Sequence, residues 1–390
     1  MTVFDELVGQ DAAAAQLGAA AAAAQEWLDG GRGTGMTHAW LFTGPPGSGR
    51  TEAALAFAAA LQCPHGGCGT CSSCHQIGAG THADVLRVRP SGLSMGVAQT
   101  RDLVRSSAAA PVGGRFRVVV FEDADRATEA AANALLKAVE EPPARTVWLL
   151  CTPTSDDLPV TIRSRCRAVV LRTPSTRAVA TVLHQRNGVP WDEAESVARA
   201  AGGHLERAVR LATDEKAWKN REAVLSLPAQ LDGLGSAIAA AAHLHQTAEA
   251  EAKQATEERD ERERAELKAA FGDGATGKGV TKAVRAASGA LKDLEARQKR
   301  RATRIKRDVY DGALLDLVAF YRDVLALQVG AQVDRPTGGH DAELRHVART
   351  SGPRDTLARI EAVQECRRRI DANVNPQIAL EAMTARLCTG

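Results

Sequence analysis

The first 173 residues alternate short apolar runs with longer helix-prone stretches. The apolar runs, which we expect to be strands, lie at residues 39–43, 84–89, 116–121, 146–152 and 168–172. Most of them lack the alternation of a sheet with one solvated face, and strands that are apolar on both sides belong to a parallel sheet covered by helices. The pattern therefore predicts an α/β domain over residues 1–173, with helices on both faces of a parallel sheet.

The rest of the chain is predicted to be helical. Residues 174–215 contain three short helical patterns, separated by "NGVP" (187–190) and "AGGH" (201–204), and we expect them to form a small helical domain. Residues 216–390 should form a second, all-helical domain. Within it, residues 308–330 are strongly amphipathic, which is typical of a helix packed into a core.

A charged helical hairpin is predicted at about residues 246–307. Residues 249–266 hold eight acidic and four basic side chains, whereas residues 278–307 hold eleven basic and two acidic ones. The glycine-rich run "FGDGATGKGV" (271–280) separates the two, so two arms of opposite charge would pair with each other. In the alternative, "RQKRRATRIKR" (297–307) contacts phosphate groups. The presence of an acidic arm favours pairing.

Composition narrows the class of protein. With 390 residues the chain exceeds one ordinary core, and its 44% hydrophobic and 25% charged residues are typical of a globular protein. A net charge of +2 excludes a globally basic protein, so any nucleic-acid contact needs a local patch. The apolar runs are far shorter than the roughly 20 residues of a membrane span, and the first residues do not resemble a secretory signal. We expect a cytoplasmic protein with no membrane contact.

Four of the eight cysteines are clustered in "CPHGGCGTCSSC", as Cys63, Cys68, Cys71 and Cys74. Four soft thiolates within twelve residues suit tetrahedral zinc, and four protein ligands leave no position for water. The spacing therefore predicts a structural zinc module at about residues 63–75. His65 and His75 are alternative ligands, and free thiols are the alternative to a metal site.

The segment "GPPGSGRT" (44–51) has the glycine spacing of a phosphate-binding loop between a strand and a helix. Gly44, Gly47 and Gly49 allow backbone N–H groups to face an anion, and Thr51 stands where a hydroxyl binds magnesium. Arg50 replaces the expected lysine, and its planar fork is not an equivalent of an ammonium group. The alternative is a tight turn without a ligand.

A second acidic site follows the apolar run of "RVVVFEDADR" (117–126). In nucleotide hydrolases with this layout, the first acid is usually an aspartate that holds magnesium, and the next is a glutamate that orients water. Here Glu122 and Asp123 have the reverse order, so each side chain has the wrong length for its role. Together with Arg50 they predict a weak or absent ATPase.

Several further segments identify a family. A zinc knuckle inserted in such a module resembles the AAA+ subunits of the bacterial clamp loader of the replicative DNA polymerase. So do "FDELVGQDAAAAQL" (4–17), "ANALLKAVEEPP" (132–143) and "LPVTIRSRC" (158–166). The match covers about residues 4–213. It implies an AAA+ module with ATP and magnesium as its ligands, a small helical lid domain at 174–215 and an all-α collar domain at 216–390, in which the charged hairpin is an insertion.

The resemblance also implies roles for individual residues. Arg165 matches the arginine finger, which acts in trans in the neighbouring subunit's nucleotide site. Val8 and Gly9 match the segment that packs against adenine. Thr152, or Pro153 beside it, matches the first sensor, and Glu206 stands where the second sensor has arginine. From the bare sequence, Arg165 with Arg163 and Arg167 is alternatively a solvated run of charge.

Two types of subunit in this family share these signatures. The gamma/tau type hydrolyses ATP, whereas the delta-prime type commonly has degraded nucleotide motifs, and Arg50, Glu122 and Asp123 favour the second. The resemblance implies a subunit of DNA polymerase III that assembles with gamma/tau and delta subunits. Through that complex it would meet the sliding clamp and primer–template DNA. The alternatives are a gamma/tau-type motor subunit and a stand-alone AAA+ DNA-remodelling ATPase.

Overall fold

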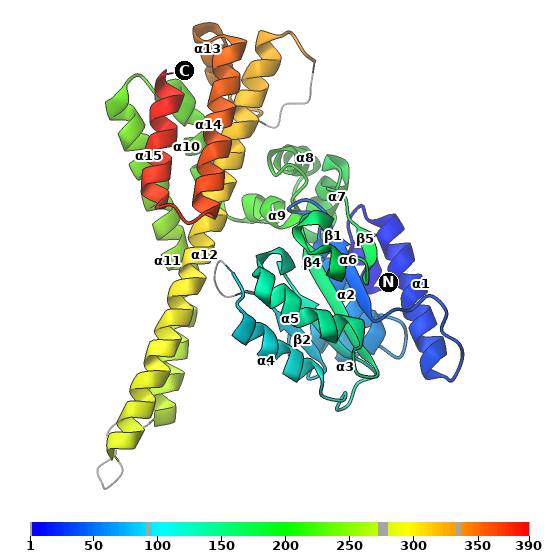
Figure 1. Cartoon of the computed structure of the whole chain (residues 1–390). Coiled ribbons are helices and arrows are strands. Elements are labelled where there is room, and N and C mark those ends of the chain that lie inside the picture. The colour runs from blue at the N-terminus through cyan, green and yellow to red at the C-terminus, as the bar shows by residue number, and fades with distance from the viewer. Residues whose placement is uncertain (1, 91–93, 272–279, 333–336, 390) are drawn as a thin grey trace. The chain divides into compact units, whose positions relative to one another are not determined.

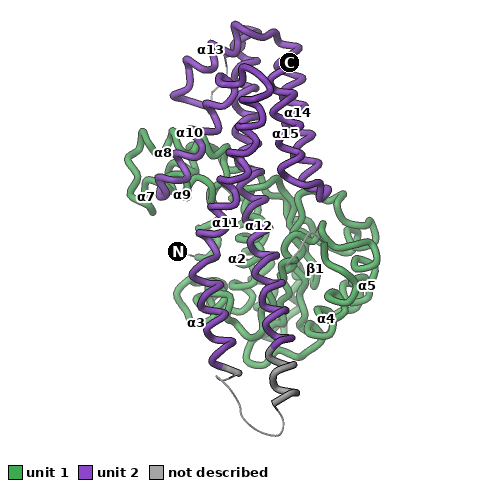
Figure 2. The backbone as a smooth tube through the Cα atoms, turned by 90° about the vertical axis from the view of Figure 1, so that its left-hand side faces the viewer, with its two compact units in different colours: residues 1–212 green, residues 213–390 purple. Residues whose placement is uncertain are grey.

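The computed structural model describes residues 2–90, 94–271, 280–332 and 337–389, and within these it gives no side chains for 270, 271 and 280–287. The chain divides into two compact units, Met1–Ala212 and Thr213–Gly390 (Figures 1 and 2). Nearly all of the predicted glycine-rich break at 271–280 lies outside the described residues.

The first unit is built on a five-stranded parallel sheet with the order β2-β3-β4-β1-β5. The strands are β1 (Ala39–Thr43), β2 (Val85–Val88), β3 (Arg117–Phe121), β4 (Thr146–Thr152) and β5 (Arg167–Val170). All five predicted strands are present. The last begins one residue earlier and ends two residues earlier than expected, although the Leu171 N–H still donates to the Thr43 carbonyl at 2.7 Å.

The three central strands, β1, β3 and β4, are buried on both faces of the sheet, as the apolar runs predicted, whereas the edge strands β2 and β5 are partly exposed. Trp40 and Phe42 of β1 face one apolar cluster, and Ala39 and Leu41 face another on the opposite side. The first cluster includes α1 (Asp11–Leu28) and α2 (Arg50–Gln62), and the second includes α4 (Val97–Ser107) and α5 (Glu129–Glu140) (Figure 1). Strands that bury both faces need no polar alternation, which explains their continuous apolar character.

The remaining elements of the first unit are short. They are η1 (Val3–Glu6), α3 (Ser72–Gly78), η2 (Ala124–Arg126), η3 (Ser155–Asp157), α6 (Val160–Arg163), α7 (Thr176–Asn187), α8 (Trp191–Ala200) and α9 (Leu205–Thr213). The last three confirm the three helical patterns after the sheet. The Ser175 hydroxyl caps α7 by accepting from the Ala178 N–H at 3.2 Å, and Gly188 ends it at φ +69°.

The described part of the second unit is helical, as expected. Its helices are α10 (Glu215–Gln230), α11 (Leu234–Phe271), α12 (Val280–Gln328), α13 (Asp341–Thr350), α14 (Pro353–Asp371) and α15 (Pro376–Thr389). Buried side chains of α12, such as Leu314, Phe320 and Tyr321, form its core with those of α10, α11 and α13–α15. None of the helices in the described ranges is both long and apolar enough to cross a membrane.

The charged segment is not separate from the amphipathic stretch that follows it. Residues 308–330 were expected as a helix of their own, whereas α12 runs through both without a break. A buried stripe continues along it, from Leu294 and Gln298 to Tyr310 and Leu314. Since no proline interrupts α12, the arm that pairs with α11 and the helix in the core are one rod.

Candidate nucleotide site and metal centre

The predicted phosphate loop lies at the carboxyl end of β1, where the chain turns into α2. In the sheet order, the connection after β1 leads to β2 at one edge, whereas β5 lies on the other side of β1. Ligands of open parallel sheets bind where the connections diverge in this way, outside the carboxyl ends of the strands. The fold therefore places "GPPGSGRT" at the expected position for a ligand.

The backbone of the loop fits an anion. Gly44, Gly47 and Gly49 have φ angles of +157°, +81° and +82°, and the last two lie in the left-handed region that favours glycine. Ser48 is buried, and its hydroxyl oxygen has no hydrogen-bond partner among the residues that the structure describes. The N-terminus of the 13-residue helix α2 follows directly. Left-handed glycines, an orphaned hydroxyl and a helix N-terminus together suit a phosphate group.

The side chain of Arg50 does not take the place of the missing lysine. Its guanidinium donates to the Gly44 carbonyl at the start of the same loop. A lysine in a phosphate loop reaches the outer phosphates, whereas Arg50 is engaged with the backbone. Thr51 lies in the first turn of α2 and has no side-chain hydrogen bond to another described residue, so its hydroxyl is available to a ligand.

The acidic side of the site is neutralised by arginines. Glu122 follows β3, is 3% exposed, and forms an ion pair with Arg87 on β2. Its second carboxylate oxygen lies 3.6 Å from Nε of Arg89. Two guanidinium groups thus compensate the charge that would attract a metal ion.

Asp123 is also compensated, at longer range. Its Oδ2 lies 3.8 Å from Nε of Arg89 and 4.0 Å from Nε of Arg126. Its backbone has φ +49° and ψ +49°, a left-handed conformation that turns the chain sharply after Glu122. The residues present fit the phosphate part of a nucleotide, but the acids do not fit magnesium, because basic side chains already hold them.

The first-sensor residues lie beside the loop without facing it. Thr152 is fully buried at the end of β4, and its hydroxyl lies 3.0 Å from the Thr154 carbonyl and 3.2 Å from Oδ2 of Asp157. The hydroxyl is thus used within its own turn. The carbonyl of Pro153 accepts from the Gly44 N–H at 3.1 Å, so this segment supports the phosphate loop through its backbone.

The segment after η1 is joined to the loop by a residue that sequence reasoning missed. Val8 is half-buried, and Gly9, at φ +68°, is placed so that a Cβ would lie 3.5 Å from Cα of Pro174. Next to them the buried Gln10 amide donates to the carbonyls of Ser48 (3.0 Å) and Arg172 (2.6 Å). A glutamine in a loop has no distinctive sequence signal, since only the fold brings Ser48 and Arg172 to it.

His204 is a second residue that the sequence did not reveal as part of this site. It precedes α9, and its imidazole packs on the phosphate loop: a Cβ on Gly47 would lie only 2.7 Å from Cγ of His204. Glu206 lies close by. Desolvation, and the nearby carboxylates of Glu206 and Glu122, raise the pKa of Glu52 on α2. Three carboxylates, those of Glu52, Glu122 and Glu206, are thus close enough to influence one another near the start of α2.

Arg87 and Arg89 were also missed. They alternate with Val88 in "LRVR", and such alternation in a mostly apolar strand is a usable signal for two charged side chains on one face of an edge strand. The position of Glu122 beside them depends on the pairing of β2 with β3, in which Arg87 stands opposite Val120. No local pattern contains that register.

Arg165 lies just beyond α6, away from the phosphate loop in sequence and half-exposed. Its guanidinium forms an ion pair with Glu140, the last residue of α5, and donates to the Thr161 carbonyl at 2.7 Å. Its neighbours have other partners, since Arg163 pairs with Asp156 and Arg167 stacks over Trp40 at 5.1 Å. The three arginines are thus individually held and do not form an undifferentiated run of solvated charge.

The clustered cysteines meet at one point. The Sγ atoms of Cys63, Cys68, Cys71 and Cys74 all lie within 4.8 Å of one another, and Sγ of Cys63 is 3.6 Å from those of Cys68 and Cys71. Zn–S bonds of about 2.3 Å in a tetrahedron put neighbouring sulfurs about 3.8 Å apart. The four side chains therefore fit a zinc ion and could hold one.

The backbone around the cluster favours thiolates. The N–H groups of His65 and Cys68 donate to Sγ of Cys63 at 3.3 and 3.4 Å. Hydrogen bonds from Thr70 lower the pKa of Cys68 to about 6, whereas burial raises the pKa of Cys74 to about 12. A metal must therefore displace the proton of Cys74, which a coordinated zinc ion does. His65 and His75 are not members of the cluster.

The fold and the loop define an α/β module of the phosphate-loop class whose acidic half is compensated. Comparison with known proteins finds relatives among the subunits of DNA polymerase III. Residues 23–175 match the family described as "DNA polymerase III, delta subunit". The chain is 37% identical over 210 residues to DNA polymerase III subunit gamma/tau of Mycobacterium bovis. The matching residues make up 51% of this chain and 35% of that protein.

Other relatives give the same picture. The tau/gamma subunit of Haemophilus influenzae is 33% identical over 209 residues, which is 51% of this chain and 30% of that protein. The delta' subunit of Bacillus subtilis is 32% identical over 195 residues, or 49% of this chain and 59% of that protein. Among solved structures, a gamma subunit-related protein of Thermotoga maritima aligns over 95% of this chain and 99% of that one, with 16% identity and a TM-score of 0.44.

The chain thus spans about a third of the length of the tau/gamma relatives that it matches. About half of this chain is homologous to the tau/gamma and delta' subunits of DNA polymerase III, and these similarities do not distinguish the two types.

Proposed function

We propose that the chain is a delta-prime-type subunit of a bacterial clamp loader. In this role it assembles with gamma/tau and delta subunits, and the complex loads the sliding clamp onto primed DNA with ATP hydrolysed at neighbouring subunits. Its own module serves as a rigid member of the ring, and it donates Arg165 to the nucleotide site of a neighbour.

The observation that carries this proposal is the pairing of Glu122 with Arg87 and Arg89. A hydrolytic site needs a carboxylate free to hold magnesium or to orient the attacking water. Release of Glu122 from Arg87 and Arg89 would leave a carboxylate that is only 4% exposed without a partner, and an unpaired buried charge is costly. Hydrolysis at this site is therefore disfavoured, whether or not a nucleotide binds.

Three further features support the same conclusion. Arg50 donates to its own loop, Thr152 is engaged with its own turn, and Glu206 adds negative charge near Glu52 on the helix that follows the loop. The glycine loop, Ser48 and the N-terminus of α2 still suit an anion. We therefore propose that the site either holds a phosphate-bearing ligand without turnover or is a packing surface for the helical segment that carries His204.

The surroundings of Arg165 support a role at a subunit boundary. Its guanidinium is about 39% exposed and is held by Glu140, a partner with the same exposure. Such a pair contributes little to stability, so exchanging Glu140 for the phosphate of a neighbouring subunit's nucleotide costs little. A planar guanidinium that reaches a transferring phosphoryl group stabilises the charge of the transition state.

We further propose that Cys63, Cys68, Cys71 and Cys74 bind one structural zinc ion. The site joins the end of α2 to the start of α3, and the Gly67 carbonyl between its ligands accepts from the Val3 N–H at 2.8 Å. When bound, the ion crosslinks this segment, and the N-terminal residues pack on it. No catalytic step passes through this site, because all four ligands come from the protein.

The test is the ATPase activity of the reconstituted complex of this chain with its gamma/tau and delta subunits. Arg165→Ala should lower DNA-stimulated hydrolysis strongly, by two or more orders of magnitude at the one neighbouring site that it serves. Arg163→Ala removes an equally charged neighbour that pairs with Asp156 and should leave the rate unchanged. Equal rates for wild type and Arg165→Ala would exclude the trans role, provided that both assemble.

A gamma/tau-type motor subunit is the second candidate, favoured by the intact glycine geometry of the loop and the available hydroxyl of Thr51. It predicts magnesium-dependent hydrolysis by the isolated chain that Gly49→Val or Thr51→Ala abolishes. A stand-alone AAA+ remodeller would in addition form homo-hexamers. A delta-prime-type subunit should show neither ATP hydrolysis nor self-assembly, and should assemble only with the other clamp-loader subunits.

A further inference from the structure

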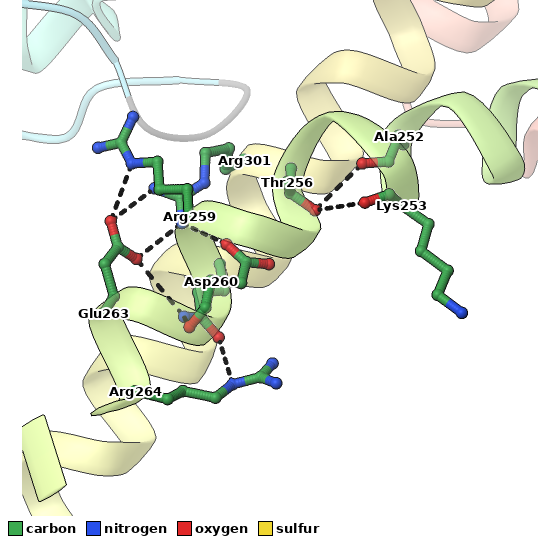
Figure 3. Close-up of polar contacts among 9 residues, drawn as sticks. Ala252, Lys253, Thr256, Arg259, Asp260, Glu263, Arg264 and Arg301 are labelled. Atoms are coloured by element: carbon green, nitrogen blue, oxygen red, sulfur yellow. Dashed lines mark hydrogen bonds and ion pairs between the residues drawn. The ribbon is translucent and has the colours of Figure 1, made fainter. Parts of the chain in front are cut away.

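The two arms of the charged hairpin neutralise each other only along the face on which they meet. Figure 3 shows Arg301 of α12 between Glu263 and Asp260 of α11. The two guanidinium nitrogens of Arg301 donate to the two Glu263 carboxylate oxygens at 3.0 and 2.7 Å. Further along, Nζ of Lys306 lies 2.7 Å from Oε1 of Glu249. The predicted pairing of opposite charges is thus present on the inner face.

The buried side chains between the arms are a mixture of apolar and polar groups. Leu294 and Thr256 are each 4% exposed. Gln298 is equally buried, and its amide donates to the Asp260 carbonyl at 3.0 Å while its oxygen accepts from Arg264 at 3.0 Å. This network sets the rotation of α12 about its axis, because Leu294, Gln298 and Arg301 follow one another at helical spacing on the inner side.

The outer side of α12 keeps its positive charge. Lys292, Arg297, Lys299 and Arg300, which we term the basic outer face, are all exposed and form no ion pair with any residue that the structure describes. Asp293 and Glu295 are the acidic residues of the same stretch. At 100° per residue, Lys292, Lys299 and Arg300 lie on the side of the helix away from the Leu294–Gln298–Arg301 stripe, and Arg297 lies on the flank of that stripe. The acidic arm therefore leaves them uncompensated.

We propose that the basic outer face binds the sugar–phosphate backbone of duplex DNA. Its four cations extend over about 12 Å of helix, at about 1.5 Å per residue. A duplex presents about one charge per 1.7 Å of axis, so this length of helix faces several phosphates. Such contacts read charge and not sequence, in agreement with side chains that have no fixed polar partner.

Nucleic acid fits this face better than a protein does. The other exposed residues between 292 and 303 are Asp293, Glu295, Ala296 and Thr303, and none of them has a large apolar or aromatic side chain. Stable protein interfaces depend on such buried anchors, whereas phosphate binding depends on charge released from counterions. The acidic side chains of α11, including the exposed Glu257, Glu258 and Glu261, repel phosphate, so DNA is directed to the α12 side alone.

The proposal goes beyond the proposed function, since it requires neither nucleotide turnover nor Arg165. It is tested by fluorescence anisotropy of the full chain with a labelled 20-base-pair duplex across a salt series. The variant Arg297→Gln/Lys299→Gln/Arg300→Gln removes three charges of the basic outer face. Its matched control, Lys253→Gln/Arg262→Gln/Lys268→Gln, removes three exposed charges from α11 that likewise have no ion-pair partner among the described residues.

The wild-type chain should bind the duplex with an affinity that falls steeply with salt. The outer-face variant should bind about tenfold or more weakly at low salt, and the slope of log K against log salt should fall by about two to three. The α11 variant should stay within about threefold of wild type. Circular dichroism checks that both variants keep their helical content.

Three results would overturn the proposal. They are no binding by the wild-type chain, equal weakening by both variants, and no weakening by the outer-face variant. If the chain instead binds polyglutamate through the basic outer face and not the duplex, its partner is an acidic protein, and the proposal for DNA is refuted. None of these results bears on the ATPase test of Arg165, so the two proposals fail separately.

Discussion

Replacing Arg301 with glutamine should open the distal part of the hairpin without unfolding the second unit. Arg301 joins α12 to α11 through a bidentate pair with Glu263 and a further contact with Asp260. The side chains involved are 14 to 24% exposed, so the pair is neither fully buried nor freely solvated. Arg300 next to it faces outward without an ion-pair partner among the described residues, which makes Arg300→Gln the matched control.

The magnitude follows from the carboxyl group of Glu263. Hydrogen bonds from Arg301 lower its pKa from 4.5 to about 2. One pKa unit corresponds to about 1.4 kcal/mol, so the ceiling of the interaction is about 3 kcal/mol. Solvent near the pair screens it and reduces this value, since exposed pairs contribute about 0–1 kcal/mol. We expect a coupling of about 1–2 kcal/mol between Arg301 and Glu263.

The pH dependence has a definite sign. Because the pKa of Glu263 is lower in the folded hairpin than in the unfolded chain, its pair with Arg301 stabilises the hairpin fully above pH 4.5. The contribution is lost as the pH falls from 4.5 toward 2, where the carboxyl takes up its proton in the folded state as well. Arg301→Gln should therefore lower stability at pH 7 and have little effect near pH 2.

The assay is amide hydrogen exchange of residues 257–269 and 294–304, because it reports local opening of the two arms separately from the core. A double-mutant cycle with Glu263→Gln isolates the coupling. A coupling below about 0.3 kcal/mol, or an equal loss of protection in Arg300→Gln, would refute the assignment of Arg301 as the link between the arms.

Two further predictions concern the first unit. Metal analysis of the purified chain should find about one zinc ion per molecule. Chelation or Cys68→Ser should release the ion and expose residues 63–78 to proteolysis, whereas the control Cys366→Ser should not. Absence of metal from the purified chain would contradict the site. Gly47→Ala should lower the unfolding free energy of the first unit by about 1–3 kcal/mol in urea denaturation, because Gly47 has a φ of +81° and His204 approaches it closely. His204→Ala should recover part of this loss in the double variant. If the effects of the two substitutions on unfolding free energy are fully additive, the contact is contradicted.

Elements whose signal lies within one short segment could be predicted from the sequence. The five strands are mostly apolar, and the three central ones, β1, β3 and β4, are buried on both faces of the sheet, which is typical of a parallel sheet covered by helices. The cysteine spacing likewise predicted a four-sulfur cluster, because the short segment between α2 and α3 holds all four Sγ atoms within 4.8 Å of one another. The glycine spacing of the phosphate loop predicted a backbone with positive φ angles, because few other residues adopt them.

Pairings between distant segments could not be predicted. The order of Glu122 and Asp123 suggested a weakened site, but the arginines that hold Glu122 come from β2, and only the sheet register brings them there. His204 reaches Gly47, and Gln10 reaches Ser48 and Arg172, across long stretches of sequence. Local patterns contain no information on such contacts.

In the charged hairpin, too, some features could be predicted from each segment and others depend on the tertiary structure. The sequence by itself determined that two arms of opposite charge lie side by side, because charge content and helical period are properties of each segment alone. Which cations pair and which face outward was decided by the tertiary structure, through the rotation of α12 that buries Leu294 and Gln298 and turns Arg301 toward α11. The physical reason is that burial of one side sets the rotation of a helix about its axis. That rotation decides whether each charged side chain meets a partner or faces solvent.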